Sequence, residues 1–158
     1  MDLACFIKTD ETNPRVIANC KMTTNHNLDI ETKVIERFVI KTKRDRYLTF
    51  IKNDKTREKF ISDLHHMNFL QTDLFDKVEG NEYDVIKARI KSLGVLNDCY
   101  LISDSSRLDK KRLDIDTALK ETIGSDCGTI IVFGDAEIIY SEAEGFNNRW
   151  ISKPIKFK

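Results

Sequence analysis

The hydrophobic pattern is most regular between residues 97 and 152, where short apolar runs alternate with turn signals. Residues 99–102 are apolar and precede four small polar residues, which is typical of a buried strand that ends in a loop. Residues 129–133 show no polar alternation, so we expect a central strand that is covered on both faces. A Gly-Asp turn signal predicts that residues 137–140 return as its hairpin partner, and residues 149–151 predict a last strand at a sheet edge.

Capping residues and apolar spacing predict two helices in the second half of the chain. Asp114 can accept hydrogen bonds from the free amides of a first helical turn, and Gly124 can adopt the left-handed conformation that ends the helix. Asn81 and Gly94 bound another helix in the same way. The apolar stripe of the helix after Asp114 consists of Ile115, Ala118, Leu119, Thr122 and Ile123. That of the helix after Asn81 consists of Tyr83, Ile86, Ile90 and Leu93.

The N-terminal region is expected to contain strands. Residues 3–8 and 15–22 are strand-like runs on either side of a turn-rich loop, which predicts a hairpin. Residues 23–29 are polar and predict a loop. Residues 34–40 alternate in a way that predicts a strand with one face better buried than the other.

Two short helices are predicted to follow. Thr42 is the expected cap of the first, and the pair Asn53-Asp54 is expected to end it and cap the second. The segment 68–80 is irregular and connects to the later elements. We therefore predict one α+β domain over residues 1–158, with a mixed, mostly antiparallel sheet, about four helices and a loosely held tail at 153–158.

Composition changes this picture little. The 26 basic and 26 acidic side chains cancel, so net charge gives no support for a long-range field that attracts nucleic acid or anionic lipid. The four cysteines form no C-x-x-C pair and lie in or beside apolar segments, which predicts free thiols in a reducing compartment. No basic, apolar leader and no membrane-spanning run is recognised, so we predict a cytoplasmic protein without a membrane partner.

A basic run between residues 41 and 59 offers a nucleic-acid hypothesis. Its cations could contact phosphates. Acidic residues at positions 45, 54 and 58 are interleaved with them, however, which favours a solvated helical face with internal salt bridges. The residues that would bind nucleic acid in this alternative are Lys43, Arg44, Arg46, Lys55 and Arg57.

Carboxylates near predicted strand ends offer a second alternative, a metal-dependent phosphodiester hydrolase. Its metal ligands would be Asp98, Asp104 and Glu137. No lysine is placed to complete such a nuclease core. His65 and His66 are adjacent and lack the i, i+4 spacing of a two-histidine zinc motif. No phosphate-binding loop or nucleophile elbow is present, so the sequence predicts no catalytic residue and no cofactor.

Several stretches resemble small bacterial proteins of unassigned function. They are residues 99–103 with the helix at Asp114, residues 128–131 leading to 140–142, and residues 41–66. The resemblance implies a bacterial or phage cytoplasmic setting and transfers no site. The leading hypothesis is a small, non-catalytic protein that binds a protein partner or itself, such as an accessory subunit, inhibitor or immunity-type protein. The expected contact surfaces are edge strands at residues 3–8 or 149–151 and the apolar tail residues Ile155 and Phe157.

Overall fold

A computed structural model describes residues 14–145 and 148–155. The helices in this part of the chain are α1 (Pro14–Phe38), α2 (Lys41–Phe50), α3 (Asp54–Asp63), the short 3₁₀ helix η1 (Thr72–Leu74), α4 (Tyr83–Ser92) and α5 (Ile115–Thr122). The strands are β1 (Phe75–Lys77), β2 (Asp98–Ser103), β3 (Arg112–Asp114), β4 (Thr129–Phe133), β5 (Ile138–Glu142) and β6 (Arg149–Ser152). No helix in the described ranges combines the length and the apolar character needed to cross a bilayer.

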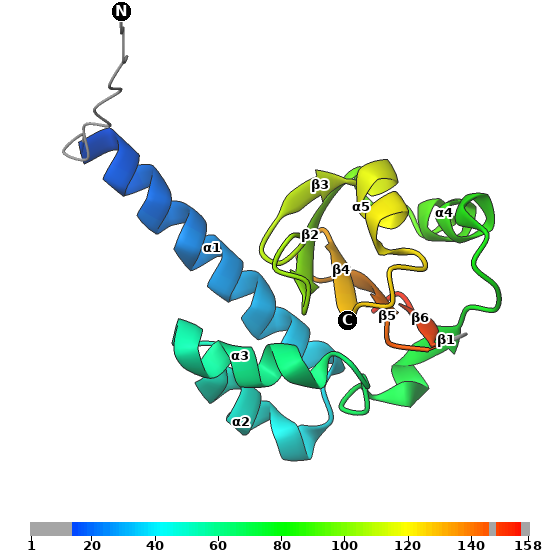
Figure 1. The fold of residues 1–158 in the computed structure, drawn as a ribbon, viewed down its shortest axis with the longest axis horizontal. Coiled ribbons are helices and arrows are strands. Elements are labelled where there is room, and N and C mark those ends of the chain that lie inside the picture. The colour runs from blue at the N-terminus through cyan, green and yellow to red at the C-terminus, as the bar shows by residue number, and fades with distance from the viewer. Residues whose placement is uncertain (1–13, 146–147, 156–158) are drawn as a thin grey trace, which may run out of the picture.

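The six strands form one sheet in the order β1-β6-β5-β4-β2-β3, and every pairing is antiparallel. Helices α1, α2 and α3 lie on one face of this sheet, and α4 and α5 lie on the other (Figure 1). The predicted α+β class is confirmed, and helices cover both faces of the sheet.

Strand alternation divides the core into two clusters. Tyr100, Val132 and Ile139 face the α1–α3 side, whereas Leu101 and Ile131 face the α4–α5 side. Strand β4 lies between β2 and β5 and is buried along its whole length, so the predicted central strand and its hairpin with β5 are confirmed. A strand with helices on both faces has no solvated side, which explains its unbroken apolar run.

The N-terminal predictions are wrong where the structure describes them. Residues 15–22, 23–29 and most of 34–40 belong to the single helix α1. The four core residues Val34, Ile35, Phe38 and Val39 are spaced i, i+1, i+4 and i+5, which is one helical face. Val34 and Phe38 taken by themselves also fit the two-residue period of a strand. The predicted strand at residues 3–8 lies outside the described residues, as does the predicted contact residue Phe157.

Two of the four predicted caps have the expected bond. The side chain of Asn53 accepts a hydrogen bond from the Lys55 amide at 2.9 Å, and that of Asp114 accepts one from the Thr117 amide at 3.0 Å. The other two caps are wrong by one or two positions, because α2 begins at Lys41 after Ile40 and α4 begins after Glu82, in both cases without a side-chain cap bond.

Strand β6 is an interior strand, which corrects the prediction that residues 149–151 lie at an edge. It pairs with β5 on one side and β1 on the other, so the edges of the described sheet are β1 and β3. The start of the tail is bound rather than loose: the Lys153 amide donates to the Leu74 carbonyl at 2.8 Å, and Ile155 packs against the core on the α1–α3 side.

Candidate functional site

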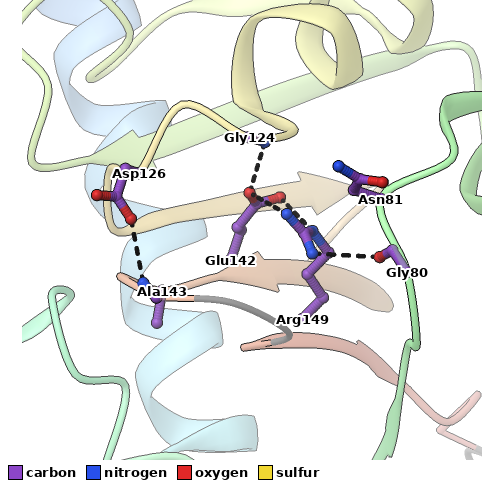
Figure 2. Close-up of a pocket in the computed structure, with 8 residues that line it drawn as sticks. Gly80, Asn81, Gly124, Asp126, Glu142, Ala143 and Arg149 are labelled. Carbon is purple, nitrogen blue, oxygen red and sulfur yellow. Dashed lines mark hydrogen bonds and ion pairs between the residues drawn. The ribbon is translucent and has the colours of Figure 1, made fainter.

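The candidate site is a cleft of about 550 Å³ on the α4–α5 side of the sheet (Figure 2). Three separate parts of the chain form it: the loop before α4, the loop after α5 and the β5–β6 hairpin. This volume is within the range of clefts that hold small molecules or short peptide segments. The lining residues are Gly80, Asn81, Gly124, Asp126, Glu142, Ala143, Gly145 and Arg149.

A buried ion pair forms one wall of the cleft. Glu142 on β5 and Arg149 on β6 are opposite each other in the strand register, and their side chains are only 3% and 8% exposed. Arg149 Nε donates to Glu142 Oε2 at 3.2 Å, and Arg149 Nη2 donates to Oε1 at 3.1 Å. Such a paired, side-on geometry stabilises charges that would be costly to bury singly.

The remaining oxygen capacity of Glu142 is used by the protein. The Gly124 amide donates to Oε1 at 2.7 Å, and the Tyr140 hydroxyl donates to Oε2 at 2.8 Å (Figure 2 draws the Gly124 bond). Burial, and then the charge of Glu142, raise the pKa of Tyr140 well above its usual range, so this hydroxyl keeps its proton. With four donors, Glu142 has no lone pair left for a substrate proton. The carboxylate is therefore a positioning group rather than a base.

Asp126 holds the two loops of the cleft together. Its Oδ1 accepts a hydrogen bond from the Gly145 amide at 3.1 Å, which joins the loop after α5 to the β5–β6 hairpin. Its backbone has φ +60°, a left-handed conformation that aspartate tolerates better than most residues. Asp126 and Asn81 are both exposed and stand at the mouth of the cleft.

Two further clefts are smaller. One of about 220 Å³ lies between the segment after α3 and β6, beside Trp150, and one of about 260 Å³ lies near Arg112 and Asp135. Their lining includes no buried charged side chain. The Arg149 cleft is thus set apart from both by its buried charge as well as by its size.

Arg57, predicted as a nucleic-acid contact, points into the protein. Its side chain is 7% exposed and lies between the carboxylates of Glu31 on α1 and Asp109 after β2. Arg57 Nη2 is 2.7 Å from Glu31 Oε1, and Arg57 Nη1 is 2.6 Å from Asp109 Oδ2. This placement corrects the prediction for Arg57, because its guanidinium already has two anionic partners and is not offered to a phosphate.

The other four residues of the basic set have separate surroundings. Lys43 donates to the side chain of Asn68 at 3.2 Å, and Arg44 donates to the Val39 carbonyl at 2.8 Å. The Arg46 guanidinium lies over the Phe50 ring, and Lys55 is exposed on the first turn of α3. Nucleic-acid binding by these four stays a prediction.

The proposed metal ligands do not converge. Asp98 begins β2, whereas Asp104 follows the other end of that strand, where it accepts from the Gly128 amide and contacts His65. Glu137 lies in the β4–β5 turn. The ligand set is therefore wrong, and within the described residues no group of three or more histidine, cysteine, aspartate or glutamate side chains is placed to hold a metal ion. Asp63 is occupied by a hydrogen bond from the Tyr47 hydroxyl at 2.6 Å.

Glu142 and Arg149 were not predicted as a charged pair, although residues 149–151 were expected to contact a partner as an edge strand. One usable signal was present: both are charged residues within strand-like, largely apolar runs, and alternation places Tyr140 on the same face as Glu142. A charge in a buried strand needs a partner. The partner becomes evident only with the register of the β5–β6 hairpin, which places Arg149 opposite Glu142.

Comparison with protein-family models, with curated protein sequences and with solved structures finds no match to this chain. The resemblance to small bacterial proteins accordingly stays a prediction.

Proposed function

We propose that this protein is a non-catalytic binding protein, and that the Arg149 cleft receives a segment of a protein partner. The observation that carries the proposal is the Glu142–Arg149 pair, a buried and fully oriented charged group in the wall of a 550 Å³ cleft. Its geometry is set by contacts within the protein, from β5, β6 and the end of α5. A group ordered in advance loses little entropy when a ligand binds, which favours recognition.

The chemistry of the wall favours binding over catalysis. Glu142 accepts four hydrogen bonds from the protein, and Tyr140 is held in its protonated form by burial and by Glu142. A general base or nucleophile needs a free lone pair directed at the substrate. Neither side chain offers one, whereas the described residues leave N–H groups of Arg149 without an acceptor.

The outline of the cleft suits a polypeptide segment. Gly80, Gly124 and Gly145 line it and carry no Cβ, so their peptide groups leave room for another main chain to approach. The exposed Asn81 and Asp126 supply polar side chains at the mouth. We place this interaction in a bacterial cytoplasm; the free thiols of Cys99 and Cys127 fit a reducing compartment.

The test is affinity capture from a bacterial cytoplasmic extract with two tryptophan variants. Asn81→Trp places a large side chain at the mouth of the cleft, and Glu58→Trp is the matched control on the exposed surface of α3. The proposal predicts a partner, identified by mass spectrometry, that binds the unmodified protein and Glu58→Trp but not Asn81→Trp. A partner retained equally by both variants would show that the cleft is not its binding site, and recovery of nucleic acid alone would favour the basic residues Lys43, Arg44, Arg46 and Lys55.

A further inference from the structure

The protein contains the same three-residue arrangement twice. In each, a buried glutamate accepts a hydrogen bond from a buried tyrosine and pairs with the Nε and Nη2 edge of an arginine. The exposed fractions also agree: 7% and 3% for the Arg57–Glu31 pair, and 8% and 3% for the Arg149–Glu142 pair. One copy ties α1 and α3 to β2, and the other lies in the wall of the cleft.

The two copies differ at the second edge of the guanidinium. A guanidinium has one edge formed by Nε and Nη2 and another formed by Nη1 and Nη2, and each edge can bind a carboxylate through two hydrogen bonds. In Arg57 the second edge binds Asp109, with Nη1–Oδ2 at 2.6 Å and Nη2–Oδ1 at 2.9 Å. In Arg149 the partner of Nη1 among the described residues is the Gly80 carbonyl at 3.2 Å, and Nη2 donates to Glu142 alone.

The second edge of Arg149 borders the cleft, because both Arg149 and Gly80 line it (Figure 2). We infer that the group recognised in this cleft is a carboxylate, which binds the Nη1–Nη2 edge of Arg149 as Asp109 binds that of Arg57. This inference rests on the proposed binding function and names the chemistry of the ligand.

The arrangement around Arg57 shows that one buried guanidinium can bind two carboxylates at once. There, one guanidinium is shared by two carboxylates and keeps its positive charge, since the hydrogen bonds to Asp109 and Glu31 raise its pKa above the ordinary value despite burial. A ligand carboxylate at Arg149 would give the same 1:2 ratio among the groups that contact the guanidinium, with Asp126 as a further anion at the mouth of the cleft. A phosphate dianion would bring an additional negative charge toward Glu142 and Asp126, so the site favours the singly charged group.

The carboxylate has two possible sources, a free small acid or the carboxyl terminus of a polypeptide. Acetate tests the chemistry alone. A short peptide with a free C-terminal carboxylate, compared with the same peptide ending in an amide, tests the polypeptide source. Sodium chloride at matched ionic strength corrects for screening.

The experiment is an NMR titration of the ¹⁵N-labelled full chain, following the Nε–H signals of its arginines. We expect acetate and the free-acid peptide to shift the Arg149 signal in a saturable way, with no shift at Arg57, whose second edge is occupied. The amidated peptide should bind roughly tenfold more weakly or worse. Asn81→Trp should weaken acetate binding, and Glu58→Trp should not.

The outcomes separate this inference from the proposed function. If Arg149 does not respond to either carboxylate, or responds equally to chloride, the carboxylate assignment is overturned even if a partner is captured through the cleft. If acetate shifts Arg149 but captured partners ignore Asn81→Trp, the carboxylate site stands and the protein-partner proposal fails. Saturation by acetate with no advantage of the free-acid peptide over its amide would assign the site to free small acids.

Discussion

Replacing Arg57 by methionine tests how firmly the α1–α3 layer is held to the sheet. Arg57 forms hydrogen bonds to Glu31 on α1 and to Asp109 after β2, and Glu31 also accepts from Tyr100 on β2. Among the described residues of this cluster (Arg57, Glu31, Asp109 and Tyr100), Arg57 carries the only positive charge, and methionine removes it. The two carboxylates then remain without a cation, with side chains that are 3% exposed at Glu31 and 18% exposed at Asp109. Loss of one partner of a buried pair typically costs about 3–5 kcal/mol.

That cost is a large fraction of the roughly 5–15 kcal/mol by which a domain of this kind is stable. With a urea m-value of about 2 kcal/mol per molar, the unfolding midpoint should fall by about 1.5–2.5 M. The measurement is urea unfolding followed by circular dichroism. Arg57→Met combined with Glu31→Leu should recover part of the loss, because an apolar replacement of the pair leaves one fewer buried anion unpaired.

A matched surface pair provides the control. Arg107 and Glu121 also approach to 2.7 Å, the distance between Arg57 and Glu31, but their side chains are 68% and 39% exposed. An exposed pair of this kind contributes about 0–1 kcal/mol, so Arg107→Met should change the midpoint little. If Arg57→Met were no more destabilising than Arg107→Met, the reasoning that burial makes the Arg57 cluster important would be refuted.

Three further predictions concern single positions. Gly128→Ala should destabilise by about 1–3 kcal/mol or more in the same urea assay, because a Cβ there would lie 2.4 Å from main-chain atoms of Leu64. An unchanged unfolding midpoint would contradict this. Thr122→Val should raise the free energy of unfolding by about 1–2 kcal/mol, because the Thr122 hydroxyl is buried without a hydrogen-bond partner among the described residues. An unchanged or lower urea midpoint would show that this hydroxyl is hydrogen-bonded in solution. Burial raises the pKa of the Cys99 thiol to about 12, so the folded state favours the protonated thiol. The stability of the protein should therefore fall as pH rises from about 9 toward 12, and Cys99→Ala should flatten that decline. An identical pH profile in both proteins would argue against this effect of Cys99.

The sequence was sufficient for elements whose signal is local. The apolar run of β4 and the caps at Asn53 and Asp114 are decided by a few neighbouring residues, and these predictions are confirmed. Helix α1 was mistaken for strands because Val34 and Phe38, four residues apart, satisfy a period of two as well as a helical period. Pattern alone does not separate the two when the apolar positions fit both.

The site depended on contacts between distant residues. Arg57 is one of several cations on α3, and its inward direction is set by Glu31 and Asp109, which are 26 and 52 positions away in the chain. Glu142 and Arg149 are closer in sequence, but their pairing follows from the β5–β6 register, which neither residue specifies by itself. Arg57 was predicted to lie on the surface because the number and spacing of charges do not show which side of a helix packs against the rest of the protein.

The interior position of β6 has a consequence for the order in which the protein matures. Strand β1 pairs with β6 alone among the described strands, and Arg149 is the first residue of β6. A ribosome synthesises β6 after all the other described elements, so a nascent chain can form α1–α5 and β2–β5 while β1 waits without a partner. The cleft, which needs Arg149, is completed by the same event that inserts β6 between β1 and β5. The proposed binding should therefore appear only when the sheet closes.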